Sequence, residues 1–430
     1  MINDILSKYL NNEKSGKLIN YSLGDITKLL SDLNNPHKNF KSLHIAGTNG
    51  KGSTAFMLSV ILEKSGYKTG LYTSPHLVRI NERIKINSHN INDALLYKYL
   101  TEIDCIISND ESISPTYFDI LTAAAFLYFR DESVDIAIIE TGLGGRLDST
   151  NVIIPEISII TDISFDHIDI LGNKIEDITK EKCGIIKPSI PVITSNTDPE
   201  IISIIEQYSA KNRSKLYSYN CDFFTQNIKR DNDHFMFDYS SDDAILPKIS
   251  LSLFPQHQIK NSAVVITALN YLRVNGFQSI SNDVIYKELE KIQVPGRFQL
   301  LYTNPVIIYD PAHNFDALNN LINGLEKFYS DKKKVFVLSM MKDKADTKTL
   351  DLLKKQDVVY FLLNDERAYM PDHDKFKLII SDENIVVDIL QQTDDINGMI
   401  IFTGTFRIYN HAVNITNELQ KRDLNIQEKK

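Results

Sequence analysis

The fold is decided by the stretch Gly47-Thr48-Asn49-Gly50-Lys51-Gly52-Ser53-Thr54. It follows the apolar run 43–46 and precedes residues 56–65, whose apolar side chains recur at helical spacing. This order predicts a buried strand, a glycine-rich turn and a helix that ends at Gly66. Such a turn presents backbone N–H groups and a helix dipole to an anion, and its lysine adds a positive charge. The stretch therefore predicts a phosphate site, in the first place for ATP bound with a divalent metal.

The spacing of the glycines leaves an alternative open. In the common pattern G-x-x-x-x-G-K-[ST], a glycine stands where this chain has Ile45, and here a further glycine follows the lysine. A glycine-rich turn with an incidental lysine would give a similar string. The phosphate site is the better hypothesis, because Lys51 lies inside the turn and two hydroxyl residues follow it.

Length and composition bound the class of protein. The 430 residues predict two or three domains, and 43% hydrophobic with 24% charged residues is ordinary for a globular protein. A net charge of −9 disfavours nucleic acid or a membrane surface as a partner. Cys105, Cys183 and Cys221 form no C-x-x-C pair, so neither a zinc site nor a disulfide framework is expected, and the chain suits a reducing cytoplasm. No signal peptide and no membrane-spanning run are predicted.

Alternating strand and helix patterns predict an α/β fold. Apolar runs at 134–139, 157–161 and 190–194 are typical of strands buried on both faces, and residues 118–129 have helical spacing. Residues 227–250 are polar and predict a β-hairpin at a sheet edge. After a linker at 294–297, a second βα series of the size of one doubly wound domain begins. We therefore expect a large N-terminal P-loop ATPase domain with a parallel sheet (residues 1–293) and a smaller C-terminal Rossmann-like α/β domain (residues 294–430).

Polar residues at strand ends suggest a metal site. Glu140 closes one apolar strand, and Asp162 and His167 follow the next one. Ligands of parallel sheets bind beyond the carboxyl ends of strands, so a carboxylate and an imidazole there could hold Mg²⁺ on ATP phosphates. Taken singly, Glu140 has the less favoured alternative of a turn carboxylate, whereas for His167 alone a loop histidine is the better hypothesis. Their coincidence beside a phosphate loop favours the metal site.

Two further residues stay open on these grounds. Lys182 lies near the end of a predicted helix over 175–183, where a lysine is usually a solvated partner of the helix dipole. Asp310 follows the strand 306–309 and precedes a helix, so it could be a helix cap or a ligand with equal weight.

Taken together, these residues resemble the folylpolyglutamate synthase and dihydrofolate synthase family of the Mur ligase superfamily. The resemblance covers nearly the whole chain. It is carried, in order, by residues 43–54, Gly70-Leu71-Tyr72-Thr73-Ser74-Pro75-His76, Asn81-Glu82-Arg83-Ile84, residues 140–151, Phe165-Asp166-His167, Glu181-Lys182-Cys183-Gly184, His257-Gln258 with Asn261, Pro295-Gly296-Arg297, Asp310 with Ala312-His313-Asn314, and Lys342-Asp343-Lys344.

The resemblance implies an ATP-dependent ligase that joins L-glutamate to dihydropteroate, to the γ-carboxylate of reduced folates, or to both. A substrate carboxylate would attack the γ-phosphate to give an acyl phosphate, which the amine of glutamate then attacks. Expected cofactors are ATP and Mg²⁺ at two sites, with a monovalent cation as a further candidate. Expected partners are small molecules only (pteroate or folate, L-glutamate and ATP), with no nucleic acid, no membrane, and a monomeric state.

The resemblance also implies roles for particular residues. Lys51, His167 and Lys182 would be catalytic, Lys182 matching a lysine that is carbamylated in relatives. Asp148, Ser149 and Thr150 would shape the site. The expected ATP-binding residues are Thr48, Asn49, Gly50, Lys51, Gly52, Ser53, Thr54, Asn261, Arg297, Asp310 and His313. The expected metal ligands are Ser53, Ser74, Glu140 and His167.

Some positions depart from the family pattern, and competing functions stay open. Asp119 stands where glutamate is usual, Pro255 and Pro311 replace glycines, and Gln299 replaces an acidic residue. A Mur-type ligase for a cell-wall precursor is less favoured, because Gly52 rather than threonine follows the lysine. A P-loop phosphotransferase, a nucleotide-switched binding protein and a catalytically dead homologue are the competing hypotheses outside that class.

Overall fold

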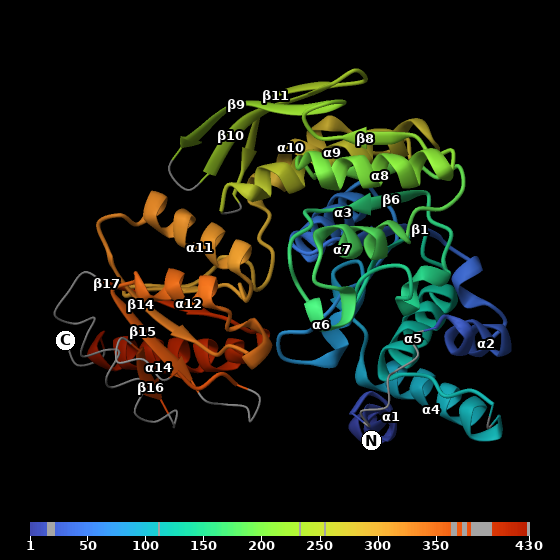
Figure 1. The fold of residues 1–430 in the computed structure, drawn as a ribbon, viewed down its shortest axis with the longest axis horizontal. Helices are drawn as coiled ribbons and strands as arrows, with labels where there is room; N and C mark the ends of the chain where they lie inside the picture. Colours follow the sequence, from blue (N-terminus) through green and yellow to red (C-terminus); the bar gives the residue numbers. More distant parts are fainter. Residues whose placement is uncertain are drawn as a thin grey trace. The chain divides into compact units, whose positions relative to one another are not determined.

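The computed structural model describes residues 1–14, 22–110, 112–231, 234–252, 255–362, 368–371, 376–379 and 398–427. The chain forms two compact units. The first comprises Met1–Ser252 and Gln258–Ile292, and the second comprises Leu253–His257 and Gln293–Lys430. Figure 1 shows each unit as a sheet with helices packed on it.

The first unit is built on an eight-stranded sheet with the order β4-β3-β2-β5-β1-β6-β7-β8. Six neighbouring strands run parallel: β2, β5, β1, β6, β7 and β8. At one edge, β3 pairs antiparallel with β2, and β4 pairs antiparallel with β3. The bounds are β1 Lys41–Ala46, β2 Thr69–Tyr72, β3 Ile84–Ile86, β4 His89–Asn90, β5 Ile136–Glu140, β6 Ile157–Ile160, β7 Val192–Thr194 and β8 Leu216–Ser218.

The strand order creates the place for a site. Strand β1 lies between β5 and β6, and the chain passes from the β5 side to the β6 side of it. In open α/β sheets, ligands bind at such a switch point, beyond the carboxyl ends of the strands. Strands β5 and β6 are buried throughout, which explains their continuous apolar runs and confirms the strands predicted there.

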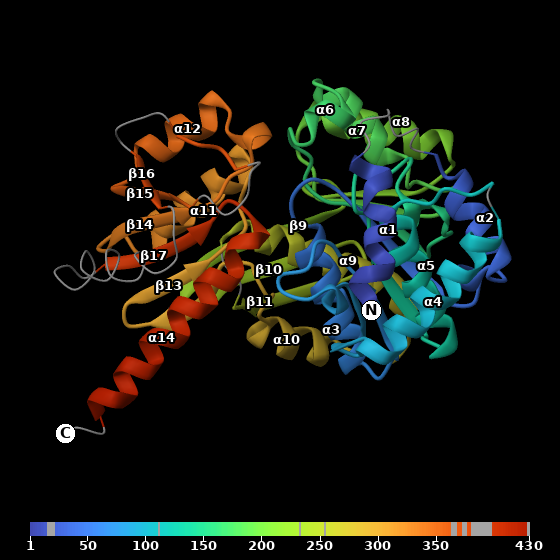
Figure 2. The same ribbon diagram turned by 90° about the horizontal axis from the view of Figure 1, so that it is seen from below.

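Helices cover the sheet and form most of the core. Helices α1, α2, α4 and α5 share one apolar core with Ala137 and Ile139 of β5 (Figures 1 and 2). Helix α3 contacts β1, β2 and β5 and packs against α10, while α7 and α8 pack together over β6 and β7. The bounds are α1 Ile2–Lys14, α2 Gly24–Asp32, α3 Lys51–Lys64, α4 Asp93–Asn109, α5 Tyr117–Asp131, α6 Ile168–Leu171, α7 Ile175–Cys183, α8 Pro199–Lys211, α9 His257–Val274 and α10 Asn282–Lys291.

A separate three-stranded sheet replaces the expected edge hairpin. Strands β9 (Phe223–Asp231), β10 (His234–Ser241) and β11 (Ile245–Leu251) are antiparallel in the order β11-β10-β9. Side chains of β10 alternate between buried and partly exposed, and β11 packs on α10. The hairpin prediction is therefore wrong in extent and position, because a third strand joins and the sheet covers a helix instead of extending the large sheet.

The second unit has a six-stranded sheet with the order β12-β13-β17-β14-β15-β16. Five neighbouring strands run parallel: β13, β17, β14, β15 and β16. At the edge, β12 pairs antiparallel with β13. Its core lies between this sheet and α11 and α12. The bounds are β12 Gln299–Thr303, β13 Val306–Tyr309, α11 Phe315–Phe328, β14 Lys333–Leu338, α12 Thr347–Lys354, β15 Val358–Leu362, β16 Phe376–Ile379, β17 Gly398–Thr403 and α14 Tyr409–Gln427.

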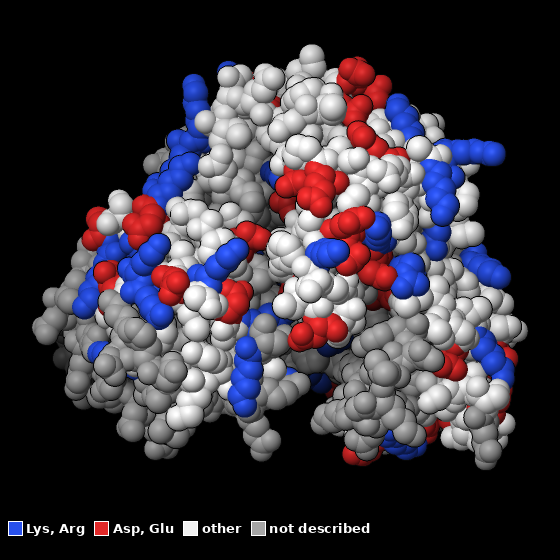
Figure 3. Space-filling model, in the orientation of Figure 1, with Lys and Arg blue, Asp and Glu red and all other residues white. Residues whose placement is uncertain are grey.

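The described surface and the three cysteines are ordinary for a globular protein. On the face drawn in Figure 3, basic and acidic side chains are interspersed over the described surface. Within the ranges that the structure describes, no helix has the length and apolar character needed to cross a membrane. All three cysteines are free thiols, and Cys183 alone among them is buried.

Candidate active site

The glycine-rich stretch forms a loop between β1 and α3, at the switch point of the sheet. Gly50 has a φ of +91° and directly precedes α3, which starts at Lys51. A Cβ on Gly47 would lie 1.9 Å from Thr161 Oγ1, so only glycine allows this close approach of the loop to β6. The first amides of a helix have no partner within it, so α3 offers them to an anion, as the sequence predicts.

Two lysines converge on one carbonyl of this loop. Lys51 Nζ donates to Gly47 O (3.0 Å) and to Thr48 O (3.3 Å), and Lys182 Nζ donates to Gly47 O (2.8 Å). Lys182 is only 4% exposed, so the expectation of a solvated helix-end lysine is wrong. Its helix packs tightly on the turn after β5, since a Cβ on Gly145 would lie 2.7 Å from Glu181 O.

The environment of Lys182 changes its acid–base behaviour. Burial lowers the pKa of its ammonium to about 7, and the neighbouring charge of Lys51 contributes to this lowering. The carboxylates of Asp166 and Asp148 oppose the shift. Near neutral pH a substantial fraction of Lys182 is therefore a neutral amine, which is nucleophilic.

A buried carboxylate stands at the next strand end. Glu140 is the last residue of β5 and is 2% exposed. Its Oε2 accepts a hydrogen bond from the backbone N–H of Ser74 (3.1 Å), which lies in the loop after β2. The structure thus brings the backbone of Ser74 to the carboxylate of Glu140, so two of the four predicted metal-ligand positions lie at the ends of neighbouring strands.

His167 lies in a different setting from Glu140. It precedes α6 with a left-handed backbone (φ +49°), and its side chain is 44% exposed. Its Nε2 lies 3.9 Å from Asp166 Oδ2, and Asp166 Oδ1 accepts its backbone N–H (2.9 Å). Phe165 and Ile168 beside it are also exposed.

The donor set fits Mg²⁺ better than a metal held by protein alone. Among the residues that the structure describes, no three His, Cys, Asp or Glu side chains form a metal-binding group. Mg²⁺ usually keeps several waters and binds through one or two carboxylates plus substrate phosphates. One buried carboxylate, Glu140, with hydroxyls beside a phosphate loop, corresponds to that pattern.

The first turns of α9 contact the other side of the loop. Gln258 Nε2 donates to Ser53 Oγ (3.2 Å), and Asn261 Nδ2 donates to Gln258 Oε1 (2.9 Å). A Cβ on Gly50 would lie 2.7 Å from Asn261 Oδ1. Asn261 therefore lies beside the loop, and its contact with ATP stays a prediction. The sequence pattern alone assigns Gln258 no role, although its spacing of three from Asn261 puts both on one helix face.

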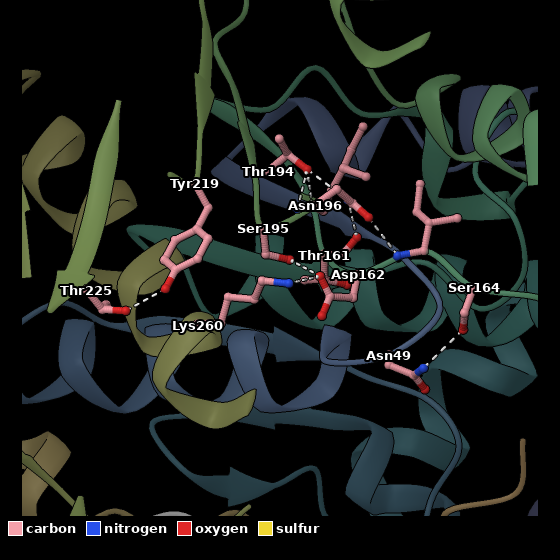
Figure 4. Close-up of polar contacts among 12 residues, drawn as sticks. Asn49, Thr161, Asp162, Ser164, Thr194, Ser195, Asn196, Tyr219, Thr225 and Lys260 are labelled. Carbon is pink, nitrogen blue, oxygen red and sulfur yellow. Dashed lines mark hydrogen bonds and ion pairs between the residues drawn. The ribbon is translucent and has the colours of Figure 1, made fainter. Parts of the chain in front are cut away.

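The loop is also fastened to the segment after β6. The backbone carbonyl of Asp162 accepts the N–H groups of Thr48 (2.8 Å) and Asn49 (3.1 Å). Thr48 Oγ1 donates to Ser164 O (3.0 Å), and Asn49 Nδ2 donates to Ser164 Oγ (3.2 Å; Figure 4). The backbone N–H groups and side chains of Thr48 and Asn49 thus fix the conformation of the loop through hydrogen bonds.

In the second unit, the predicted residues gather at the carboxyl end of β13. Asp310 Oδ2 accepts the N–H of Phe298 (2.8 Å), and burial raises the pKa of this carboxyl, with Arg297 opposing the rise. The cap of α11 is Asn314, whose side chain accepts the N–H of Ala317 (2.9 Å), so Asp310 is not that cap. His313 Nδ1 lies 2.8 Å from Pro311 O.

Two of the departures from the family pattern, Asp119 and Gln299, have structural partners, and so does Asp148, which matches the pattern. Asp119 is buried, completes a capping box with Thr116, and accepts Ser149 Oγ (2.6 Å). Gln299 Oε1 accepts the N–H of Gly296 (2.8 Å) in the turn that carries Arg297. Asp148 is buried and accepts the N–H of Leu143 (2.8 Å), and it caps the short helix 149–152. These contacts give Asp119 and Asp148 defined structural roles in the first unit and Gln299 one in the second unit.

Comparison with known families agrees with this architecture. Residues 45–269 match the Mur ligase middle domain, and residues 296–387 match the Mur ligase glutamate ligase domain. These two matches, on a chain with a strand, glycine-rich loop and helix at the switch point and a smaller α/β unit, show that the chain is a Mur ligase.

Individual relatives narrow the class. The chain is 36% identical over 329 residues to the dihydrofolate synthase/folylpolyglutamate synthase of Bacillus subtilis strain 168, covering 75% of this chain and 76% of the relative. A folylpolyglutamate synthase of Mycobacterium tuberculosis complexed with ADP superimposes with a TM-score of 0.88 at 25% identity, covering 97% of this chain and 99% of that one. A folylpolyglutamate synthase in complex with AMPPCP and folate gives 0.81 at 30% identity, covering 92% and 95%. The chain therefore belongs to the dihydrofolate synthase and folylpolyglutamate synthase family of Mur ligases.

Proposed function

We propose that this chain is an ATP-dependent ligase that joins L-glutamate to dihydropteroate, to the γ-carboxylate of reduced folates, or to both. The observation that carries the proposal is the convergence of Lys51 and Lys182 on a phosphate loop at the switch point of the sheet. The names of the relatives and the nucleotide and folate in their structures support it.

The reaction has two bond-forming steps. A carboxylate oxygen of the acceptor attacks the γ-phosphorus of ATP, which forms an acyl phosphate and releases ADP. The amine of glutamate then attacks the acyl carbon, the amide bond forms, and phosphate leaves with the loss of the amine proton. Both steps gather negative charge on phosphoryl oxygens, so fixed positive charge and oriented N–H groups lower the barrier.

The residues of the first unit divide these tasks. In the proposal, the backbone from Gly50 to Ser53 and the ammonium of Lys51 bind the β- and γ-phosphates. Asn261 of α9 contacts the nucleotide, and Arg297, Asp310 and His313 bind it from the second unit. Such contacts would hold the γ-phosphate in place for in-line attack.

Mg²⁺ is the metal that the donor set fits. We propose two Mg²⁺ sites. Ser53, Ser74, Glu140 and His167 would hold it, and the ion would supply charge neutralisation on the triphosphate. Glu140 contributes a buried carboxylate that is already fixed by the amide of Ser74. Lys182 would carry a carbamate, an anion in place of a cation.

A cavity in the first unit is the proposed place for the acceptor. Its volume is about 790 Å³, within the range of small-molecule sites, and its lining includes His76, Arg79, Tyr97 and Tyr117. The loop that starts at Ser74 supplies part of this lining, so it connects the metal-ligand position with the cavity. Aromatic rings and an imidazole there suit a flat heterocyclic acceptor.

Phosphate release from ATP tests the proposal. The assay contains Mg²⁺ and L-glutamate and compares dihydropteroate with tetrahydrofolate. Release that requires glutamate and dihydropteroate supports the dihydrofolate synthase activity, release with tetrahydrofolate supports polyglutamylation, and both support a bifunctional enzyme. Release that is independent of every acceptor would instead support a phosphotransferase or switch protein, and no release would point to a missing activator or a dead homologue.

Compartment and assembly are expectations beside the activity. With three free thiols, the expected compartment is a reducing cytoplasm. A monomer is the expected state, which size-exclusion chromatography with light scattering would check.

A further inference from the structure

The ion pair between Lys260 and Asp162 joins the phosphate loop to α9. Lys260 Nζ lies 2.9 Å from Asp162 Oδ1, although the two residues are 98 positions apart in the chain. Figure 4 shows the lysine reaching from α9 to the aspartate, with Ser195 on the same carboxylate. Both side chains are largely shielded, at 22% and 35% exposure.

Asp162 lies just after β6, and hydrogen bonds fix its position there. Ser195 Oγ donates to its Oδ1 (3.1 Å) from the segment after β7. Asn196 donates to Thr161 O (2.8 Å) and accepts the N–H of Ile163 (2.9 Å), so the residues on both sides of Asp162 are fixed. The position of its backbone carbonyl is therefore set by side chains from a neighbouring strand end.

That carbonyl in turn holds the phosphate loop. It accepts the consecutive amides of Thr48 and Asn49, the two residues before the left-handed Gly50. Lys260 is flanked in α9 by Gln258 and Asn261, which contact Ser53 and Gly50 on the other side of the loop. One helix thus contacts both ends of the loop, directly at one end and through Asp162 at the other.

Lys260 also has a defined position of its own. Its ammonium lies 5.9 Å from the ring centroid of Tyr219, and the hydroxyl of Tyr219 is hydrogen-bonded to Thr225 (Figure 4). An aromatic face beside the ammonium and a carboxylate at its tip restrict the side chain. These contacts place its charge on Asp162.

We propose that Lys260 and Asp162 are a positioning pair, which fixes Thr48 and Asn49 so that the loop amides after them are aligned for the phosphates of the nucleotide. The proposal rests on the proposed function, since it assigns the loop to a nucleotide. Lys260 does not contact the nucleotide in this proposal. It is a positioning residue, because it acts on the loop through Asp162.

Calorimetric titration with AMPPCP and MgCl₂ tests the pair without relying on turnover. Lys260→Met and Asp162→Asn should each raise the Kd about tenfold, in keeping with the loss of one charge-assisted hydrogen bond. Lys260→Arg should bind AMPPCP with a Kd within about twofold of the wild-type value, because arginine keeps the positive charge. In turnover assays, Lys260→Met should raise KM for ATP and leave kcat and KM for glutamate nearly unchanged.

A double variant and a matched control make the test specific. If Lys260 acts only through Asp162, the double variant should bind no worse than Asp162→Asn alone. Lys68→Met removes a similar long-range ion pair, with Glu132 at 2.8 Å, at the opposite ends of the strands, and should leave the Kd unchanged. A fold defect alone would lower the bound stoichiometry and not the affinity.

Any of three results would refute the proposed positioning role. The first is an unchanged Kd for AMPPCP in Lys260→Met, and the second is a double variant whose fold increase in Kd is the product of the two single increases. The third is an equal increase in Kd in Lys68→Met. Wild-type protein that fails to bind AMPPCP would be a different result, since it would reject the nucleotide site and with it the proposed function.

Discussion

Lys182 gives the sharpest quantitative prediction. Burial and the nearby Lys51 lower its pKa from 10.5 to about 7, so the neutral amine is about a tenth of the population at pH 6 and about nine tenths at pH 8. An ordinary lysine is only about 0.3% neutral at pH 8. Lys182 should therefore form a carbamate with CO₂, through a new N–C bond and the loss of a proton.

The electrostatics of the site favour this product. The carbamate is an anion, so the repulsion between Lys182 and Lys51 becomes an attraction. In the structure, Lys182 Nζ lies 2.8 Å from the Gly47 carbonyl, on a helix that packs tightly against the turn at Gly145. The neutral amine increases about tenfold between pH 6 and pH 8, and carbamate formation should increase with it.

Carbon-13 NMR with labelled bicarbonate measures this directly. Wild-type protein should show a carbamate carbon signal that grows from pH 6 to pH 8, and Lys182→Met should lack it. Lys187→Met is the matched control, since Lys187 is a partly buried lysine that, like Lys182, donates to a backbone carbonyl, Asn151 O (2.8 Å). The Lys187→Met variant should keep the carbamate signal of Lys182. No signal in wild type at pH 8, or a signal retained in Lys182→Met, would refute the reasoning.

Three other substitutions probe the same region. Lys51→Ala should reduce turnover about 100-fold or more, measured by phosphate release, and an unchanged rate would remove Lys51 from the phosphoryl site. His167→Ala should raise the Mg²⁺ concentration for half-maximal rate about tenfold, and a magnesium titration that superimposes on wild type would exclude it as a ligand. Gly47→Ala should cost about 1–3 kcal/mol in chemical unfolding, because its Cβ would overlap Thr161, and wild-type stability would contradict that packing.

The sequence predicts local features of this chain well. The strand, loop and helix around Lys51 follow from short-range pattern alone, and so does Glu140 at a strand end, because a buried parallel strand reads as a continuous apolar run. The end of α3 at Gly66 is confirmed by a φ of +94°. Each of these depends on neighbours within a few positions.

Features that depend on distant contacts could not be read in this way. Lys182 is buried because its helix packs on a turn about 40 residues earlier, and nothing near it in sequence indicates that. The pair of Lys260 and Asp162 spans 98 positions, so the strand-end position of Asp162 is visible in the sequence but its partner Lys260 is not. The third strand beside the predicted hairpin likewise depends on pairing that local pattern does not specify.

The late position of α9 in the chain has a consequence for protein synthesis. Ser53 and Gln258 are 205 residues apart, so a ribosome makes the phosphate loop long before the helix that braces it. The first compact unit also needs both Met1–Ser252 and Gln258–Ile292. A nascent chain that stops at Ser252 would carry the whole glycine-rich motif and yet lack Gln258, Lys260 and Asn261. The contacts of α9 that support the loop can therefore form only after α9 has been translated.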